Sequence, residues 1–178
     1  ANGLKLIVAD PRESDVARLA DIYLPVKPGE DPAMLAGMLN VIIAEGLYDR
    51  NFVAAHVDGF DELAEAVKAF PPEVAAERAG LDKDQLVAAA RMFASGTKGC
   101  AVTGTGPEMA GNGTLTEYLA TSLNMICARF KQEGEKSGAP RVFTSPRGNT
   151  RAQVGDPVPL YDAPGSARSR FRGLGQLG

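Results

Sequence analysis

The strongest fold signal in this chain of 178 residues is the stretch Lys5-Leu6-Ile7-Val8-Ala9-Asp10-Pro11-Arg12. Leu6, Ile7 and Val8 form an apolar run without alternation, which is typical of a parallel strand buried on both faces. Asp10 precedes a proline and is therefore expected to be extended, at the carboxyl end of that strand. Open α/β sheets bind their ligands outside the carboxyl ends of the strands. The stretch therefore predicts a nucleotide-binding edge where a carboxylate, a rigid turn and a guanidinium meet.

The composition is that of a globular protein with one full core. Hydrophobic residues make up 44% of the chain and charged residues 23%, with a formal net charge of −3. This charge argues against nucleic acid as a partner, since phosphate binding needs a basic surface. No apolar run approaches the roughly 18 residues of a membrane span, and no signal-peptide pattern opens the chain. We expect a cytoplasmic segment of a longer protein, with a periplasmic parent as the alternative.

Two cysteines, Cys100 and Cys127, are too few for a disulfide framework and lack metal-ligand spacing. Both lie in apolar contexts and are expected to be reduced core residues. His56, the single histidine, is expected to be a surface or half-buried residue without an acid–base role.

Periodicity and capping residues predict a helix-rich continuation. A short strand over residues 22–26 contains a proline, which favours an edge position. Asp31 as N-cap and Pro32 at the first helical position begin a helix that ends near Gly46. Further helices are expected over residues 49–57, 60–70, 72–80, 82–96 and 115–130, a second buried strand over 99–104, and a glycine-rich loop over 105–113. A strand, glycine loop and helix in this order place backbone N–H groups near a phosphate.

The predicted fold class is α/β, a Rossmann-like open and mainly parallel sheet flanked by helices, with a long irregular C-terminal tail. Residues 1–145 form the α/β domain, with a helical insertion at about 49–95 and a third strand over 141–144. Residues 146–178 are a Gly-, Pro- and Arg-rich tail or interdomain segment, because periodicity ends there. Its arginines are either solvated charges or contacts with neighbouring domains.

In this order, the segments resemble the molybdopterin oxidoreductase superfamily, which includes formate dehydrogenases, periplasmic nitrate reductases and dimethyl sulfoxide reductase. The resemblance covers residues 5 to about 130 and depends on Ile7–Arg12, Leu19–Asp21, Pro28–Asp31, Met34–Leu35, Ile42–Asp49, Phe52–Ala54, Gly59–Phe60, Ala89–Ala94 and Gly104–Gly106. It implies a domain of a much larger subunit that holds one of two molybdopterin guanine dinucleotides on molybdenum or tungsten.

The resemblance also implies the residues that bind the cofactor. At the strand ends these are Asp10, Pro11, Arg12, Glu13, Ser14, Gly29, Glu30 and Asp31. In the glycine-rich loop they are Thr105, Gly106 and, where the family has a glutamine, Met109. The 4Fe-4S cluster and the metal ligand of the parent enzyme match nothing in this chain, so no catalytic or metal-binding residue is implied here.

The residue types suit a guanine nucleotide. Guanine presents adjacent N1–H and N2–H donors, and one carboxylate, Asp10 or Asp31, accepts both; Asp10 alternatively binds ribose hydroxyls. Arg12 pairs either with pyrophosphate or, on a solvated surface, with Glu13 or Asp15. Gly29 lets the backbone approach a ligand closely. Asp31 also serves as a helix cap, which competes for its oxygens.

The resulting hypothesis is a cofactor-binding domain of a formate dehydrogenase-like enzyme, not catalytic by itself. Its expected partners are the remaining domains of the same subunit and an iron–sulfur electron-transfer subunit, with no nucleic acid and no membrane. The excised segment is expected to self-associate through apolar surface that its neighbours would cover. The alternative is a non-catalytic nucleotide-binding or scaffold module with the same fold.

Overall fold

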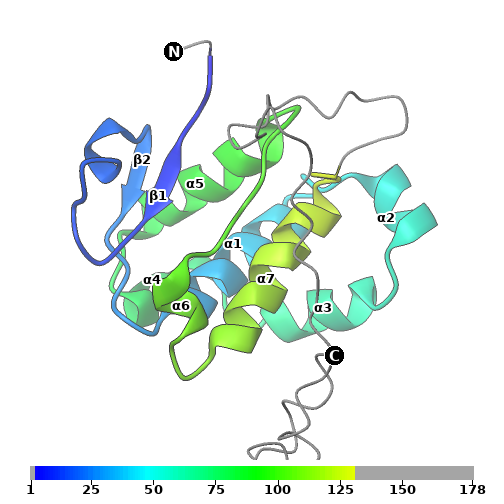
Figure 1. Cartoon of the computed structure of the whole chain (residues 1–178). Helices are drawn as coiled ribbons and strands as arrows, with labels where there is room; N and C mark the ends of the chain where they lie inside the picture. Colours follow the sequence, from blue (N-terminus) through cyan, green and yellow to red (C-terminus); the bar gives the residue numbers. More distant parts are fainter. Residues whose placement is uncertain (1–2, 131–178) are drawn as a thin grey trace, which may run out of the picture. The chain divides into compact units, whose positions relative to one another are not determined.

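The structure, a computed structural model, describes residues 3–130 (Figure 1). Two strands, β1 (Ile7–Ala9) and β2 (Ile22–Leu24), flank a 3-10 turn, η1 (Ala17–Leu19). The helices of this part are α1 (Asp31–Ala44), α2 (Arg50–His56), α3 (Phe60–Val67), α4 (Pro72–Ala79), α5 (Lys83–Ser95), α6 (Thr105–Glu108) and α7 (Gly113–Ile126). The fold is therefore α/β and rich in helix. The strand predicted over 141–144, the tail and the domain boundary near 145 lie outside the described residues.

The two strands form a parallel pair in which Ile7, Val8 and Ala9 lie opposite Ile22, Tyr23 and Leu24. Their amino ends are held together by Asp21, whose carboxylate accepts from the Lys5 ammonium at 2.7 Å and from the Leu6 amide at 2.8 Å. The Lys5 hydrogen bond is the main reason that the pKa of Asp21 lies below its usual value. Within residues 3–130 the sheet has these two strands only.

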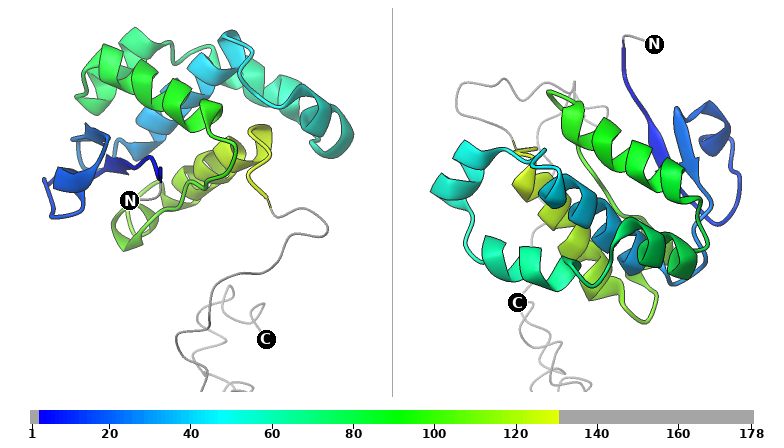
Figure 2. Two further views of the ribbon diagram at one scale, coloured as in Figure 1. Left: turned by 90° about the horizontal axis from the view of Figure 1, so that it is seen from above. Right: turned by 180° about the vertical axis from the view of Figure 1, so that it is seen from behind.

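Helix α1 is the centre of the core and is surrounded by α3, α4, α5 and α7 (Figures 1 and 2). Ten of its fourteen residues are buried, including the predicted apolar positions Met34, Leu35, Met38, Val41 and Ile42. A helix that is apolar on all sides is stable only when neighbours cover it completely. At Gly37 an added Cβ would lie 2.5 Å from the Ala75 Cβ, so α4 packs against α1 at a distance that only glycine permits. The β1–β2 pair and the α2–α3 pair lie on opposite sides of α1 and α7.

The helix starts and stops follow the predicted capping residues, because the local hydrogen bonds are those that the caps supply. Asp49 accepts from the Phe52 amide, and Asp82 accepts from the Gln85 amide, each at 2.9 Å. Gly80, the C-cap of α4, and Gly46, one residue beyond the C-cap of α1, have positive φ angles of 71° and 65°. Both predicted caps of α1 are shifted by one residue: Glu30 is the N-cap, with Asp31 as the first helical residue, and Glu45 is the C-cap.

The predicted strand over 99–104 is not a strand. The segment is extended, but a side chain of α7 takes the place of a neighbouring strand: Asn124 donates to the Ala101 carbonyl and accepts from the Ala101 amide, both at 2.8 Å. The following loop contains the helical turn α6. Leu115 and Tyr118, predicted to be buried in the helix after it, are exposed, while Thr116 and Ala120 are buried.

Burial also departs from expectation at β1 and at one cysteine. Ile7 and Val8 are half-buried and Ala9 is exposed, because β1 is covered on one face only. Cys100 is exposed, since the extended segment that carries it lies at the surface, whereas Cys127 is buried as predicted.

Candidate functional site

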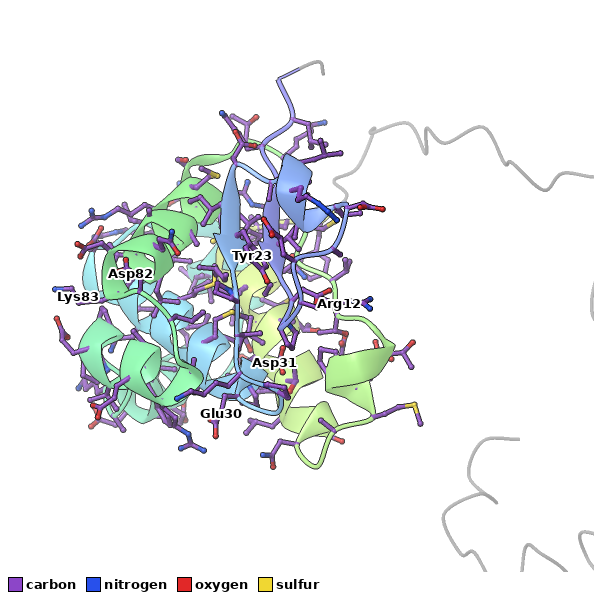
Figure 3. The ribbon with its side chains drawn as sticks, turned by 90° about the vertical axis from the view of Figure 1, so that its left-hand side faces the viewer. Arg12, Tyr23, Glu30, Asp31, Asp82 and Lys83 are labelled. Atoms are coloured by element: carbon purple, nitrogen blue, oxygen red, sulfur yellow. The ribbon has the colours of Figure 1, made fainter. Side chains whose placement is uncertain are left out.

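The carboxyl ends of β1 and β2 meet at one edge of the described unit. The Asp10 amide donates to the Leu24 carbonyl at 3.2 Å, which continues the strand pairing by one residue. The Tyr23 hydroxyl donates to the Asp10 carbonyl oxygen at 2.9 Å. The loop after β1 and the turn that leads to Asp31 therefore leave the sheet at the same edge (Figure 3). Arg12 lies in the first of these segments, and Asp31 lies at the end of the second (Figure 3).

The loop after β1 is shaped by its own side chains. One carboxylate oxygen of Asp10 accepts from the Arg12 amide at 2.8 Å, which closes a local turn. The Ser14 hydroxyl accepts from the Ala17 amide at 3.3 Å and begins η1. The alternative pairing of Arg12 with Asp15 does not occur, because Asp15 pairs with Arg18 at 2.8 Å. Pro11, Arg12 and Glu13 are exposed, and the Arg12 guanidinium makes no ion pair with any residue between 3 and 130.

The edge carries negative charge. Burial is the main cause of the raised pKa of Tyr23, and the Asp10 and Glu13 carboxylates add to it. These two carboxylates therefore lie near the Tyr23 hydroxyl. The edge thus offers acceptors to a ligand, with Arg12 as the cation on the same loop.

A tight turn over Lys27–Glu30 delivers the chain from β2 to α1. The Glu30 amide donates to the Lys27 carbonyl at 3.0 Å, with Pro28 and Gly29 in the central positions. Gly29 has φ of 85°, a left-handed conformation that suits glycine at this position of a turn. An added Cβ at Gly29 would meet nothing within 4 Å, so the space beside its backbone is open.

Asp31 is the shielded carboxylate of this edge, with 9% of its surface exposed. It makes no ion pair with the described residues, and its burial raises the pKa of the carboxyl group. Because Glu30 is the N-cap, Asp31 does not cap α1; a hydrogen bond from its own backbone amide to the carboxylate lowers the pKa and partly opposes the effect of burial. A buried carboxylate without a cation costs stability, which is a feature common at binding sites.

Glu30 is already engaged. Its carboxylate accepts from the Arg78 Nε at 2.7 Å, across to the last turn of α4. This pair could not be predicted from the sequence, because the two residues are 48 positions apart.

The third predicted group lies on α6. Thr105 and Gly106 are exposed within the helical turn, and Met109, just after it, is 82% exposed. Figures 1 and 3 place α6 at the same end of the unit as the start of α1. The hydrogen bonds around α6 link Thr103 to Glu108 and Glu117, and none joins it to the strand-end loops within residues 3–130.

Two hollows lie in this part of the surface. One, of about 440 Å³, lies between β2 and α5 and is lined by Asp21, Ile22, Tyr23, Pro25, Gln85 and Ala88. The other, of about 580 Å³, is formed by the residues from Glu108 to Tyr118. Neither is lined by Asp10 or Asp31.

Other binding features can be stated for the described residues alone. There, no group of three or more His, Cys, Asp or Glu side chains could hold a metal ion. Nor does any helix of residues 3–130 have the length and apolarity to cross a membrane. His56 is exposed on α2, on the side of the unit away from the strands.

Comparison with known proteins adds the family. No family model matches the chain. It is 40% identical over 138 residues, 78% of this chain, to acetylene hydratase from Syntrophotalea acetylenica. It is 35% identical over 153 residues, 85% of this chain, to formate dehydrogenase H from Escherichia coli. Among solved structures, acetylene hydratase from Pelobacter acetylenicus matches 72% of this chain and 18% of its own, with a TM-score of 0.71 and 40% identity. The chain spans about a fifth of the length of the curated relatives it matches, 19% and 20%.

The catalytic subunit of assimilatory nitrate reductase from Bacillus subtilis is 30% identical over 163 residues. The formate dehydrogenase and nitrate reductase relatives imply a class of large enzymes with a molybdenum or tungsten pterin cofactor. The chain is homologous to a part of these enzymes, which is consistent with a fragment from the molybdopterin oxidoreductase superfamily.

Proposed function

We propose that this chain is the part of a larger molybdenum or tungsten enzyme that holds the guanine nucleotide end of one pterin cofactor. The supporting observation is the shielded, unpaired carboxylate of Asp31 at the carboxyl ends of parallel strands, beside the open backbone of Gly29. A carboxylate in this state gains most from a ligand with two adjacent N–H donors, which guanine has and adenine lacks.

The chemistry of the edge suits the nucleoside more than the phosphates. Asp10, Glu13 and Asp31 supply acceptors for guanine and ribose donors, while Arg12 is the cation available for pyrophosphate. In this proposal Gly29 admits the base close to the backbone, and Thr105 and Gly106 on α6, with Met109 just after it, contact the pterin side. When bound, the cofactor supplies the metal at which the reaction takes place. The residues of this chain bind and orient it.

The open edge fits a domain that other parts of the protein complete. We propose that these remaining domains cover the cofactor, complete the open parallel sheet and carry the iron–sulfur cluster that passes electrons to a partner subunit, in a cytoplasmic enzyme. The reaction is proposed to be redox chemistry of the formate dehydrogenase type. The higher identity to acetylene hydratase, 40% against 35%, makes hydration the second candidate reaction.

Metal and guanine content of the full-length protein tests this proposal. Purified protein with Asp10→Ala and Asp31→Ala combined should lose most of its bound metal and guanine nucleotide, while Asp58→Asn, at an exposed position between α2 and α3, should keep both. Full occupancy in the folded double variant would contradict the assignment. A full-length protein that never contains pterin would favour the scaffold module.

A further inference from the structure

We infer that Arg78 is a positioning residue of the proposed guanine site, acting through Glu30, and that Glu30 anchors the turn instead of contacting the nucleotide. This inference rests on the function proposed above. It changes the role of a residue that the family resemblance places among the ligand contacts.

Three separate contacts attach the turn Lys27–Glu30 to the end of α4. The Lys27 amide donates to the Ala79 carbonyl at 2.9 Å, so the backbone of the turn is fixed to the last residue of the helix. The aliphatic part of Lys27 lies over Gly80, where an added Cβ would be 2.5 Å from Lys27 Cε. The third contact is the ion pair between Arg78 and Glu30, at 2.7 Å.

The ion pair acts at the residue next to Asp31. Glu30 is the N-cap of α1, and its carbonyl accepts from the Ala33 and Met34 amides at 3.0 and 3.2 Å. Its position therefore sets where α1 begins and where Asp31 lies. Arg78 also neutralises the charge of Glu30, which lies beside the Asp31 carboxyl group, whose pKa is raised by burial. With Glu30 paired with Arg78, Asp31 is the neighbouring carboxylate that makes no ion pair within residues 3–130.

A matched pair at the other end of α1 provides the control. Arg91 on α5 donates to both carboxylate oxygens of Glu45, the C-cap of α1, at 2.9 and 2.7 Å. The exposed fractions are similar, 55% and 31% for Arg78 and Glu30 against 59% and 36% for Arg91 and Glu45. Both pairs therefore attach a neighbouring helix to an end of α1, but only one of them is next to Asp31.

Titration of the 178-residue chain with GDP, followed by NMR so that weak binding is measurable, tests the inference. Exposed ion pairs are worth about 0.2–1 kcal/mol, so Arg78→Ala should raise the GDP Kd about 1.5- to 5-fold. Glu30→Gln should raise it similarly, the double variant should be no worse than either single one, and Arg78→Lys should recover part of the loss. Arg91→Ala should leave the Kd unchanged while lowering stability to a similar extent.

The outcomes separate the two proposals. The guanine site stands if the chain binds GDP and Asp31→Asn removes this binding. The positioning role of Arg78 is then wrong if Arg78→Ala has no effect on the GDP Kd, or if its effect adds to that of Glu30→Gln. An equal effect of Arg91→Ala on Kd would also overturn the role, because it would reflect loss of stability alone. If the chain binds GDP no better than ADP, the proposed guanine site is wrong, and the inference fails with it.

Discussion

Replacing Asp31 by asparagine should make the chain more stable and at the same time weaken its binding of guanine nucleotides. Asp31 is 9% exposed, and burial raises its pKa above the ordinary value of 3.8. The neutral form is therefore the one that the fold prefers. The contribution of Asp31 to the free energy of unfolding is most favourable below pH 3.8, where the carboxyl group is neutral in the folded and unfolded states. This contribution is lost as the pH rises through the raised pKa of the folded state. At pH 7 the ionised carboxylate destabilises the folded chain, and asparagine removes that cost.

The effect on binding has the opposite sign and can be estimated from hydrogen bonds. The carboxylate can accept from both N1–H and N2–H of guanine, whereas an asparagine carbonyl accepts from one and its NH₂ group faces the other. The loss of one hydrogen bond to a charged group costs about 1.5–3 kcal/mol, which raises the GDP Kd roughly 10- to 150-fold. ADP binding should not change, because adenine lacks the N1–H donor.

Urea unfolding between pH 4 and 8, together with GDP titration, measures both effects in the same variants. Asp31→Asn should have a higher urea midpoint than the wild-type chain at pH 7 and a weaker pH dependence of the free energy of unfolding. Asp58→Asn, on an exposed loop, should match the wild type in both assays. An Asp31→Asn variant that is more stable but binds GDP normally would refute the guanine assignment, and one that is less stable at pH 7 would refute the burial argument.

Three further changes test other parts of the structure. Gly29→Ala should lower the free energy of unfolding by about 1–2 kcal/mol, because the φ of this residue is 85°, and Gly29→Asn should lower it less. Both variants should bind GDP more weakly. Normal GDP binding by the asparagine variant would exclude close approach of the base to this backbone. Gly37→Ala should lower the free energy of unfolding, measured in urea, by about 1–2 kcal/mol, because the cost of overpacking exceeds the roughly 1 kcal/mol gain in helix propensity. The added Cβ would lie 2.5 Å from the Ala75 Cβ, so adding Ala75→Gly should recover part of the loss. A stabilised single variant would show that α4 can move away. A thiol reagent at pH 8 should label the exposed Cys100 and not the buried Cys127, because burial raises the pKa of the Cys127 thiol to about 11. If the folded Cys100→Ser variant still reacts, the end of α7 must open readily.

Local signals predicted most of the helices correctly. Asp49 and Asp82 cap the helices that follow them, and Gly80 ends α4, because each acts through hydrogen bonds or dihedral angles within a few residues of itself. The strand before Asp10 was predicted for a similar reason, whereas its pairing with β2 was not. Asp10-Pro11 ends the first strand, and a short connection returns the chain beside it.

What depends on distant residues was not predictable from the sequence. An apolar run over residues 99–104 resembles a strand, yet its Ala101 backbone is paired by Asn124, which is 23 positions away. Burial on both faces was expected for β1, whose residues are half-buried or exposed. A strand is buried only where other elements pack on it, and the apolar pattern of the strand does not predict which elements these are.

The strand-end carboxylates show the same division. That Asp10 and Asp31 follow strand ends was predictable from nearby residues, because proline and turn residues act on their immediate neighbours. That Asp31 is shielded without a cation while Glu30, one residue before it, is paired with Arg78 of α4 depends on the packing of distant elements. Shielding and pairing depend on which helix lies against the turn, and that is set by the packing of α4 on α1 around Gly37.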